Sequence, residues 1–297
     1  MISDIEVVPA RFPCASASAF VFGAAALAFS WLPAAASPIV SDPVPDPVSP
    51  PLEVVKVGVF TLAPYVMSGP DGPTGALVAF FDKEIAPRMG VRFDWQRPMT
   101  TARLQSSLAS GAVTFAPILA RTPARLRARL RFAGEAYVRL DPCIAVLPDS
   151  PLIRIDSPAD LAGISVGWVQ AGALPAFMLD RRIRLDRIGT VEWTAANLEK
   201  LRFGRIGAAY FSNPYTPQHV AGQAGMKVRL ISLPVKGPLL YGTFAPRTPK
   251  ALVERYRKAA AEAFADDRFS KYLHRALVEE VLSRPPGEGG KRDGGAR

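Results

Sequence analysis

The chain has 297 residues, 49% of them hydrophobic and 21% charged, which is the balance of a globular protein with a large core. Its formal net charge is +10, and its basic residues are scattered along the chain. No block of basic residues is interleaved with aromatic ones, so we expect no nucleic-acid partner. A basic surface suits anionic small molecules or an anionic membrane surface.

The few cysteines and histidines exclude several kinds of site. Cys14 lies in an N-terminal segment that we expect to be removed, which leaves Cys143 as the only thiol. The mature chain could then form no internal disulfide and no cysteine-based zinc cluster. His219 and His274 are the only histidines and are far apart in the sequence, which argues against a histidine-containing catalytic triad and against a two-histidine metal site. We expect no cofactor, and a structural role for Cys143.

The N-terminal residues 1–36 have the features of a signal peptide. Residues 15–32 are dominated by Ala, Phe, Val and Leu, and the small residues Ala34 and Ala36 follow in a small-x-small pattern. We therefore expect export to the periplasm with cleavage before Ser37. A membrane anchor is the alternative, because the apolar run is about as long as a short transmembrane helix requires.

Segments of biased composition flank the part that is expected to fold. Residues 37–51 carry a proline every few positions, which is typical of an extended linker. Residues 284–297 are rich in glycine and charge, which predicts a disordered tail. The folded part is therefore expected to span residues 52–283.

Within this part, predicted strands alternate with predicted helices. The strands are apolar runs at Val54–Phe60, Val91–Trp95, Thr114–Leu119, Val138–Leu147, Ile164–Val169, Val191–Trp193, Ala208–Phe211, Val228–Leu233 and Leu239–Phe244. The helices are expected at Ala76–Met89, Thr100–Ser110, from Pro123 onward, and at Ser157–Leu161, Leu174–Arg182, Ala195–Phe203, Thr216–Gly225 and Pro249–Leu282. This alternation predicts an α/β fold whose ligand binds at the carboxyl ends of parallel strands.

An arginine-rich stretch, residues 114–132, predicts an anion site. Thr122–Pro123 is a favourable helix start, because Thr caps the first turn and Pro fits its first position. Arg121 and Arg125 then bring positive charge to a helix N-terminus, which favours acids. A bound carboxylate or phosphate would explain the pattern, since free backbone N–H groups and a guanidinium fork both bind anions. Alternatively, Arg121, Arg125 and Arg129 lie four residues apart on one solvated helix face.

Four passages of the folded part stand in a recognisable order. They are VVKVGVFTLAPYVM with Gly75 after it, LQSSLASGAVTFAPILARTPAR, SPADLAGISVGWVQAGA and LEKLRFGRIGAAYFS. This series resembles the extracellular solute-binding proteins of family 3, the type II periplasmic binding proteins that serve amino-acid ABC importers. The resemblance covers about residues 54–277, and it rests on the order and spacing of the passages together.

The resemblance implies two lobes joined by two hinge strands, with a ligand cleft between them. The first lobe would comprise residues 52–142 and 242–283, and the second residues 143–241. In this family the arginine of the Thr-Pro-x-Arg step binds the carboxylate of the ligand, and Arg125 is the matching residue.

The resemblance also implies further ligand contacts. Tyr65 matches an aromatic residue that packs on the ligand, and its alternative role is a core or turn aromatic. Residues Gln170–Ala173 would open a second-lobe helix whose N–H groups meet the carboxylate when the lobes close. Gly172 in this segment could instead serve only a tight turn.

One departure from the family concerns the ammonium group of an amino acid. Family members that bind amino acids carry an Asp on a second-lobe strand, and that position is Ser212 here. Ser212 and Asn213 can donate or accept hydrogen bonds, but they cannot neutralise an ammonium. The departure favours a carboxylate or another anion that has no cationic group.

The resemblance therefore predicts a monomeric periplasmic binding protein, not an enzyme, that captures a small carboxylate-bearing solute for an ABC permease. One alternative is a lyase similar to cyclohexadienyl dehydratase, which would need an acid or base in the cleft. Asp82, Glu135 and Asp141 are the candidate acids, and the sequence assigns none of them to the cleft. The other alternative is a sensory binding module without a role in transport.

Overall fold

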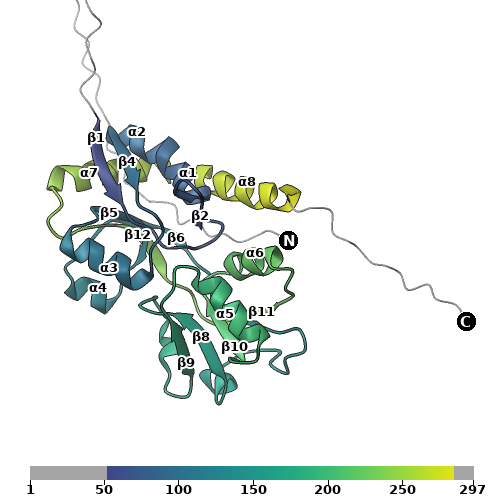
Figure 1. The fold of residues 1–297 in the computed structure, drawn as a ribbon. Coiled ribbons are helices and arrows are strands. Elements are labelled where there is room, and N and C mark those ends of the chain that lie inside the picture. Colours follow the sequence, from purple (N-terminus) through teal and green to yellow (C-terminus); the bar gives the residue numbers. More distant parts are fainter. Residues whose placement is uncertain (1–51, 284–297) are drawn as a thin grey trace, which may run out of the picture. The chain divides into compact units, whose positions relative to one another are not determined.

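The computed structural model describes residues 52–283, and of residues 279–283 it describes the backbone alone. The predicted signal peptide 1–36, linker 37–51 and tail 284–297 lie outside the described residues. Two five-stranded sheets and the helices around them make up most of the described part (Figure 1).

The first sheet has the strand order β4–β1–β5–β12–β6. Its strands are β1 (Glu53–Val57), β4 (Val91–Trp95), β5 (Phe115–Ala120), β6 (Arg131–Arg139) and β12 (Leu239–Phe244). β1 pairs in parallel with β4 and β5, whereas β12 is antiparallel to β5 and β6. Every residue of β5 is buried, as expected for a central strand with both faces covered.

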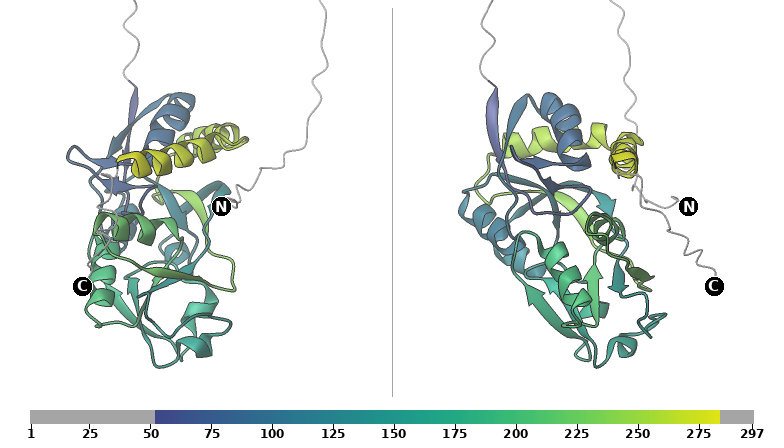
Figure 2. Two further views of the ribbon diagram at one scale, coloured as in Figure 1. Left: turned by 90° about the vertical axis from the view of Figure 1, so that its right-hand side faces the viewer. Right: turned by 45° about the vertical axis from the view of Figure 1, so that its right-hand side comes forward.

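Helices cover both faces of the first sheet (Figure 2). On one face lies a continuous helix, as predicted, which consists of α1 (Ala76–Phe80), a π-helical turn (Phe81–Ile85) and α2 (Ala86–Met89). It contacts α7 (Lys250–Ala263) and α8 (Arg268–Ser283). The other face carries α3 (Thr101–Ser110) and α4 (Pro123–Arg127). There Leu104 and Leu108 of α3 share a buried cluster with Leu119 of β5.

The second sheet has the strand order β11–β7–β10–β8–β9. Its strands are β7 (Cys143–Val146), β8 (Ser165–Val169), β9 (Arg184–Ile188), β10 (Ala208–Phe211) and β11 (Arg229–Ser232). β8 pairs in parallel with β9 and β10, and β7 is antiparallel to β10 and β11.

Short elements complete the two halves. The helices α5 (Trp193–Arg202) and α6 (Tyr215–Gln223) accompany the second sheet, with the 3-10 turns η2 (Pro158–Leu161) and η3 (Ala176–Leu179). A small hairpin, β2 (Met67–Ser68) and β3 (Pro73–Thr74), precedes α1. We call the first sheet with α1–α4, α7 and α8 the first lobe, and the second sheet with α5 and α6 the second lobe.

The chain passes between the lobes twice. The first passage is Leu140–Pro142, between β6 and β7, and the second is residues 233–238, between β11 and β12. The two passages run side by side, since Leu140 N donates to Pro238 O at 3.3 Å and Leu233 N donates to Pro142 O at 3.1 Å. β12 pairs with the first sheet from Leu239 onward, so the predicted boundary between residues 241 and 242 falls inside this strand.

Several predicted elements differ from the structure. The predicted strand Val138–Leu147 is two strands, the end of β6 in the first sheet and β7 in the second, with Leu140–Pro142 between them. The predicted helix Leu174–Arg182 is only the turn η3, and β9, which the sequence did not indicate, follows it. The predicted strand Val191–Trp193 is a turn that leads into α5, where Trp193 is the first residue. The long helix predicted to end at Leu282 is interrupted between α7 and α8, because the Asp266 carboxylate accepts from the N–H of Arg268 at 2.9 Å and starts a new helix.

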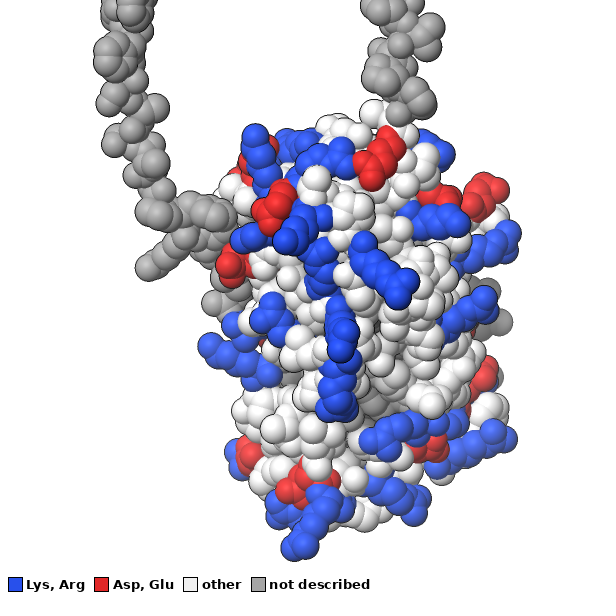
Figure 3. Space-filling model, turned by 90° about the vertical axis from the view of Figure 1, so that its left-hand side faces the viewer, with Lys and Arg blue, Asp and Glu red and all other residues white. Residues whose placement is uncertain are grey.

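The outer surface is rich in cationic side chains. Figure 3 shows a face on which Lys and Arg outnumber Asp and Glu, in line with the net charge of +10. Such a surface attracts anionic solutes. Within residues 52–283, no helix combines the length and the apolar character needed to cross a membrane.

Candidate ligand-binding site

A small cavity lies between the two lobes, near the carboxyl ends of β1, β5, β8 and β10. It is lined by Phe60, Leu62, Thr101, Ile118, Leu119, Ala120, Arg125, Leu140, Trp168, Val169, Gly172, Ala173, Trp193, Ser212, Pro238 and Leu240. Its volume is about 40 Å³, whereas pockets that hold small molecules measure roughly 300–1,000 Å³. In this arrangement of the lobes the cavity is therefore smaller than a typical ligand pocket.

Hydrogen bonds hold the lobes against each other in this closed state. The hydroxyl of Thr61 donates to Val191 O at 2.6 Å, and the indole of Trp193 donates to Thr61 O at 3.0 Å. The hydroxyl of Thr216 donates to Ala63 O at 2.6 Å. These contacts join the two lobes beside the cavity.

Arg125 is the one charged side chain that lines the cavity. Thr122 caps the start of α4, with its hydroxyl accepting from Arg125 N at 3.3 Å, and Pro123 occupies the first helical position. Arg125 is the buried residue of the short helix α4, with its side chain between the lobes, and it is 2% exposed. Nη1 donates to Ala120 O at 2.7 Å, and Nη2 donates to Ala171 O of the second lobe at 3.3 Å.

The positive charge of Arg125 has no counter-ion among the described residues. Its guanidinium donates to two backbone carbonyls, and its buried Nε–H has no hydrogen-bond partner among these residues. Burial lowers the pKa of Arg125 to about 10, because the protein interior disfavours the charged form. A buried, unpaired cation is costly, and an anion placed beside it would remove most of that cost.

Two more buried polar atoms of the cavity lining lack a partner. The hydroxyl of Thr101, at the first residue of α3, and the indole Nε1–H of Trp168, near the end of β8, have no hydrogen bond within the described structure. Thr101 is 2% exposed and Trp168 is 4% exposed. Ser212, which follows β10, also lines the cavity and is buried. The polar groups of the cavity thus come from both lobes.

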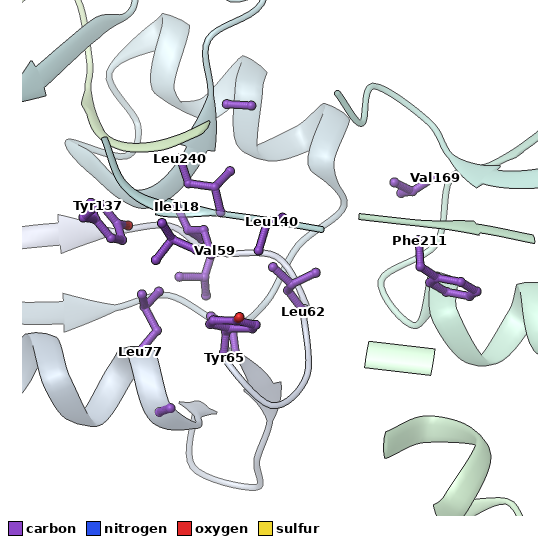
Figure 4. Close-up of a cluster of buried hydrophobic side chains, with 14 of the residues drawn as sticks. Val59, Leu62, Tyr65, Leu77, Ile118, Tyr137, Leu140, Val169, Phe211 and Leu240 are labelled. Atoms are coloured by element: carbon purple, nitrogen blue, oxygen red, sulfur yellow. The ribbon is translucent and has the colours of Figure 1, made fainter. Parts of the chain in front are cut away.

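The aromatic lining differs from the one that the sequence suggested. Phe60, Trp168 and Trp193 line the cavity. Tyr65 does not: it is 2% exposed and lies among buried apolar side chains of the first lobe (Figure 4), with its ring stacked 6.4 Å from that of Phe269. Tyr65 therefore occupies the alternative position considered for it, that of a core aromatic.

Arg121 lies outside the cavity. Its guanidinium is 4.7 Å from the ring centroid of Tyr241 and 5.4 Å from that of Phe132, and the residue is exposed. Arg121 precedes α4 and Arg129 follows it with a left-handed φ of 57°. The prediction that Arg121, Arg125 and Arg129 form one helical stripe is therefore wrong, because α4 is too short to align them.

The segment around Gln170 is not the start of a helix, contrary to expectation. Gln170 N donates to Ile188 O at 2.8 Å, and Gln170 is exposed and absent from the cavity lining. Gly172 does line the cavity, and a β-carbon there would lie 2.5 Å from the Trp168 ring. Ala171 adopts a left-handed φ of 60°, in the turn whose carbonyl accepts from Arg125. The segment thus offers a carbonyl, and not a row of free N–H groups.

Asn213 is buried in a turn of its own. Its side-chain oxygen accepts from Thr216 N at 2.9 Å, and its amide nitrogen donates to the Thr216 hydroxyl at 3.0 Å. These bonds satisfy groups at the start of α6. Asn213 does not line the cavity, in contrast to its neighbour Ser212.

The candidate acids of the enzyme alternative do not line the cavity either. Asp82 accepts from the indole of Trp95 at 2.8 Å on the outer side of the first lobe. Glu135 and Asp141 are exposed. Within the described part of the chain, no three His, Cys, Asp or Glu residues are grouped so that they could hold a metal ion.

Comparisons with known proteins find similarity in structure. No protein-family model and no curated protein matches the sequence. The amino acid ABC transporter substrate-binding protein AbpA from Streptococcus pneumoniae, bound to L-arginine, is 19% identical with a TM-score of 0.63, over 77% of this chain and 95% of that one. A mutant of ArgBP from T. maritima is 20% identical with a TM-score of 0.60, over 76% and 95%.

The structural similarity extends to a further protein. The VFT2 domain of BvgS from Bordetella pertussis is 20% identical with a TM-score of 0.61, over 75% of this chain and 92% of that one. Each of these matches spans nearly the whole length of the matched protein. The chain has the two-lobed α/β fold of the type II periplasmic binding proteins, as its sequence resemblance implied.

Proposed function

We propose that this protein is a periplasmic solute-binding protein that captures a small carboxylate-bearing solute for an ABC importer. The observation that carries the proposal is Arg125, a buried cation that faces the cavity between the lobes without a counter-ion. The similarity to AbpA, a substrate-binding protein of an amino acid ABC transporter, supports the same kind of role.

In the proposed mechanism, the open cleft admits the solute and Arg125 binds its carboxylate. In the closed state the guanidinium donates to Ala120 O and Ala171 O, and its remaining N–H groups, the buried Nε–H among them, are available to the ligand. Closure of the lobes then excludes water, which strengthens the ion pair. Ser212 and Gly172 would face the ligand from the second lobe.

We assign structural roles to the other candidate residues. Tyr65 packs in the core, Arg121 stacks on aromatic rings at the surface, and Asn213 stabilises the start of α6. Gln170 supports the turn that carries Ala171. The proposed lobes follow the two sheets, with the second passage between them completed before Leu239.

Binding is favoured over catalysis because the cavity offers no general acid or base. Arg125 is its one titratable side chain, and Asp82, Glu135 and Asp141 lie outside the lining. A guanidinium is a poor proton donor or acceptor near neutral pH. A lyase would need a proton-transferring group that the described lining does not supply.

Export is the part of the proposal that rests on the sequence alone. The apolar run and the Ala34–Ala36 pattern would direct the chain through the inner membrane, with cleavage before Ser37. The mass of protein isolated from a periplasmic fraction tests this step. A mature chain that still begins near Met1 and sediments with membranes would replace export by anchoring.

A ligand screen tests the proposed function as a whole. Purified protein is heated with single carboxylates, amino acids and phosphates, because a ligand that binds only the native state raises the melting temperature. We expect a rise with one or more carboxylates and none with inorganic phosphate. Uptake of the radiolabelled hit should then depend on the gene in cells. A screen in which no carboxylate stabilises the protein would refute the proposal.

A further inference from the structure

We propose that the ligand is a monocarboxylate with an apolar body and no ammonium group, and that Thr101 and Trp168 donate hydrogen bonds to its polar end. The inference rests on the proposed function and specifies the substrate class of that same site. It follows from three properties of the lining: where its charge lies, which polar atoms lack partners, and how much of it is apolar.

The first property is the lack of a group that could receive an ammonium. The lining side chains that can form hydrogen bonds are those of Thr101, Arg125 and Ser212 and the indoles of Trp168 and Trp193, and none is a carboxylate. The carbonyls of Ala120 and Ala171 already accept from the guanidinium. An ammonium needs several acceptors and a negative partner in a dry site. Here it would be buried near a second positive charge.

The second property is the surplus of donors. The Nε–H of Arg125, the hydroxyl of Thr101 and the indole N–H of Trp168 are buried and have no partner in the described structure. An indole N–H can only donate, so its partner must be an acceptor such as a carboxylate or keto oxygen. Leaving such groups unpaired is costly. A ligand with an oxygen-rich end would satisfy all three.

These donors come from different lobes. Thr101 and Arg125 belong to the first lobe, and Trp168 belongs to the second. One carboxylate can meet all of them only in the closed state. The same ligand group would therefore bind and draw the lobes together.

The third property is the apolar remainder of the lining. Four of its larger side chains are Phe60, Leu62, Trp193 and Leu240. They offer no hydrogen bond to a polar ligand body, apart from the Trp193 indole, which already donates to Thr61 O. Hydroxyl or amide groups on that body would lose their water without compensation. An alkyl or aryl body loses nothing and buries its apolar surface.

The test compares ligands that share one carbon skeleton. Calorimetric titrations use 4-methylpentanoate, L-leucine and 3-methylbutylamine, and then 3-phenylpropanoate, L-phenylalanine and 2-phenylethylamine. The protein is first unfolded, dialysed and refolded to remove any co-purified ligand. We expect at least one of the two carboxylates to bind, its amino acid to bind at least about 100-fold more weakly, and its amine not to bind.

The outcomes separate this inference from the proposed function. If an amino acid binds as tightly as the carboxylate of the same skeleton, or more tightly, the inference is wrong and the proposed function stands. If neither series binds, and phosphates or sugars do, both are wrong. Binding of the amines as tightly as the carboxylates would also overturn both.

Two conservative variants test the named donors. Thr101→Val removes one donor and keeps the shape of the side chain, and Trp168→Phe removes another and leaves a smaller aromatic ring. Each should weaken carboxylate binding by about 10-fold or more. Thr194→Val and Trp95→Phe are matched controls, because both residues lie outside the lining, and they should change affinity less than about 2-fold.

A second measurement does not depend on the stability of the variants. In wild-type protein labelled with 15N-tryptophan, the indole N–H resonance of Trp168 should move when the bound carboxylate is added, and that of Trp95 should not. Unchanged affinity in both donor variants, together with a fixed Trp168 resonance, would overturn the assignment of these residues.

Discussion

Replacing Arg125 by alanine is expected to abolish most of the ligand affinity while the fold persists. The side chain is buried between the lobes, and its charge meets only the carbonyls of Ala120 and Ala171. A carboxylate that binds beside it exchanges water for a fixed cation. Alanine would leave that carboxylate in the same dry cavity with no charge to balance it.

The structure sets the magnitude of this loss. Burial lowers the pKa of Arg125 to about 10, so the charged form costs about 3 kcal/mol in the ligand-free closed state. A bound carboxylate would recover much of that cost. The figure agrees with the 2–5 kcal/mol or so that truncating one partner of a desolvated charge pair typically costs. Affinity should therefore fall by about 100-fold.

Calorimetric titration with the carboxylate found by screening measures the effect. Arg121→Ala is the matched control, because Arg121 lies near the same helix start and stacks on Tyr241 outside the cavity. It should bind within about 2-fold of wild type. Arg125→Lys should recover only part of the affinity, since an ammonium cannot reproduce the planar fork.

Two results would refute this reasoning. Equal affinity in wild type and Arg125→Ala would show that the carboxylate lies elsewhere. An equal loss in Arg121→Ala would show that surface charge, and not the buried guanidinium, attracts the ligand. Circular dichroism and melting temperature of each variant exclude misfolding as the cause.

Three further predictions follow from other parts of the structure. Thr61→Val removes the hydrogen bond to Val191 between the lobes and should weaken ligand binding by about 3- to 10-fold. Ser68→Ala, which removes the exposed bond to Glu192, should change the affinity little. Equal effects of the two variants in calorimetry would contradict this. Burial raises the pKa of the Cys143 thiol to about 12, so this thiol in the native protein should not react with iodoacetamide at pH 8. The affinity of Cys143→Ala for the ligand should stay within a few-fold of the wild-type value. Loss of binding with the fold intact would make Cys143 a site residue. Above pH 10 the free energy of unfolding, measured with urea, should fall by about 1.4 kcal/mol per pH unit for each tyrosine whose phenol pKa is raised by burial. The reason is that these phenols lose their protons at lower pH in the unfolded chain than in the native one. A free energy of unfolding that stays constant from pH 10 to 11 would contradict this. Burial raises the phenol pKa of Tyr65, Tyr137, Tyr210 and Tyr256, and also that of the less buried Tyr215 and Tyr272.

The sequence predicted the fold well where local patterns and tertiary packing agree. Val91–Trp95, Ala208–Phe211 and Leu239–Phe244 are strands with the predicted bounds. The capped helix start at Thr122–Pro123 is present, and it accounts for the inward position of Arg125. Caps and short apolar runs are local, so the sequence displays them directly.

The cavity lining was harder to predict, because it depends on contacts between distant segments. Trp168 and Trp193 stand in predicted strands with no sign of a site role, and both are buried and line the cavity. The placement of Trp168 near the carboxyl end of a predicted parallel strand was the available clue. Tyr65 has the same kind of placement after β1, but Phe60 and Leu62 line the cavity instead and Tyr65 packs behind them.

The bond between Arg125 and Ala171 O has a consequence for how a partner could tell the loaded protein from the free one. Closing the lobes without a ligand buries a charge that has no counter-ion, so the desolvation cost of the guanidinium favours the open state. A bound anion neutralises the guanidinium and removes this cost, and the Arg125 side chain then bridges both lobes. Because linkage is reciprocal, a partner that binds only the closed form must also raise the affinity of the protein for the anion. A permease that binds only the closed form would thus bind the ligand-loaded protein in preference to the free protein. The neutralisation of one charge would be enough to make this difference.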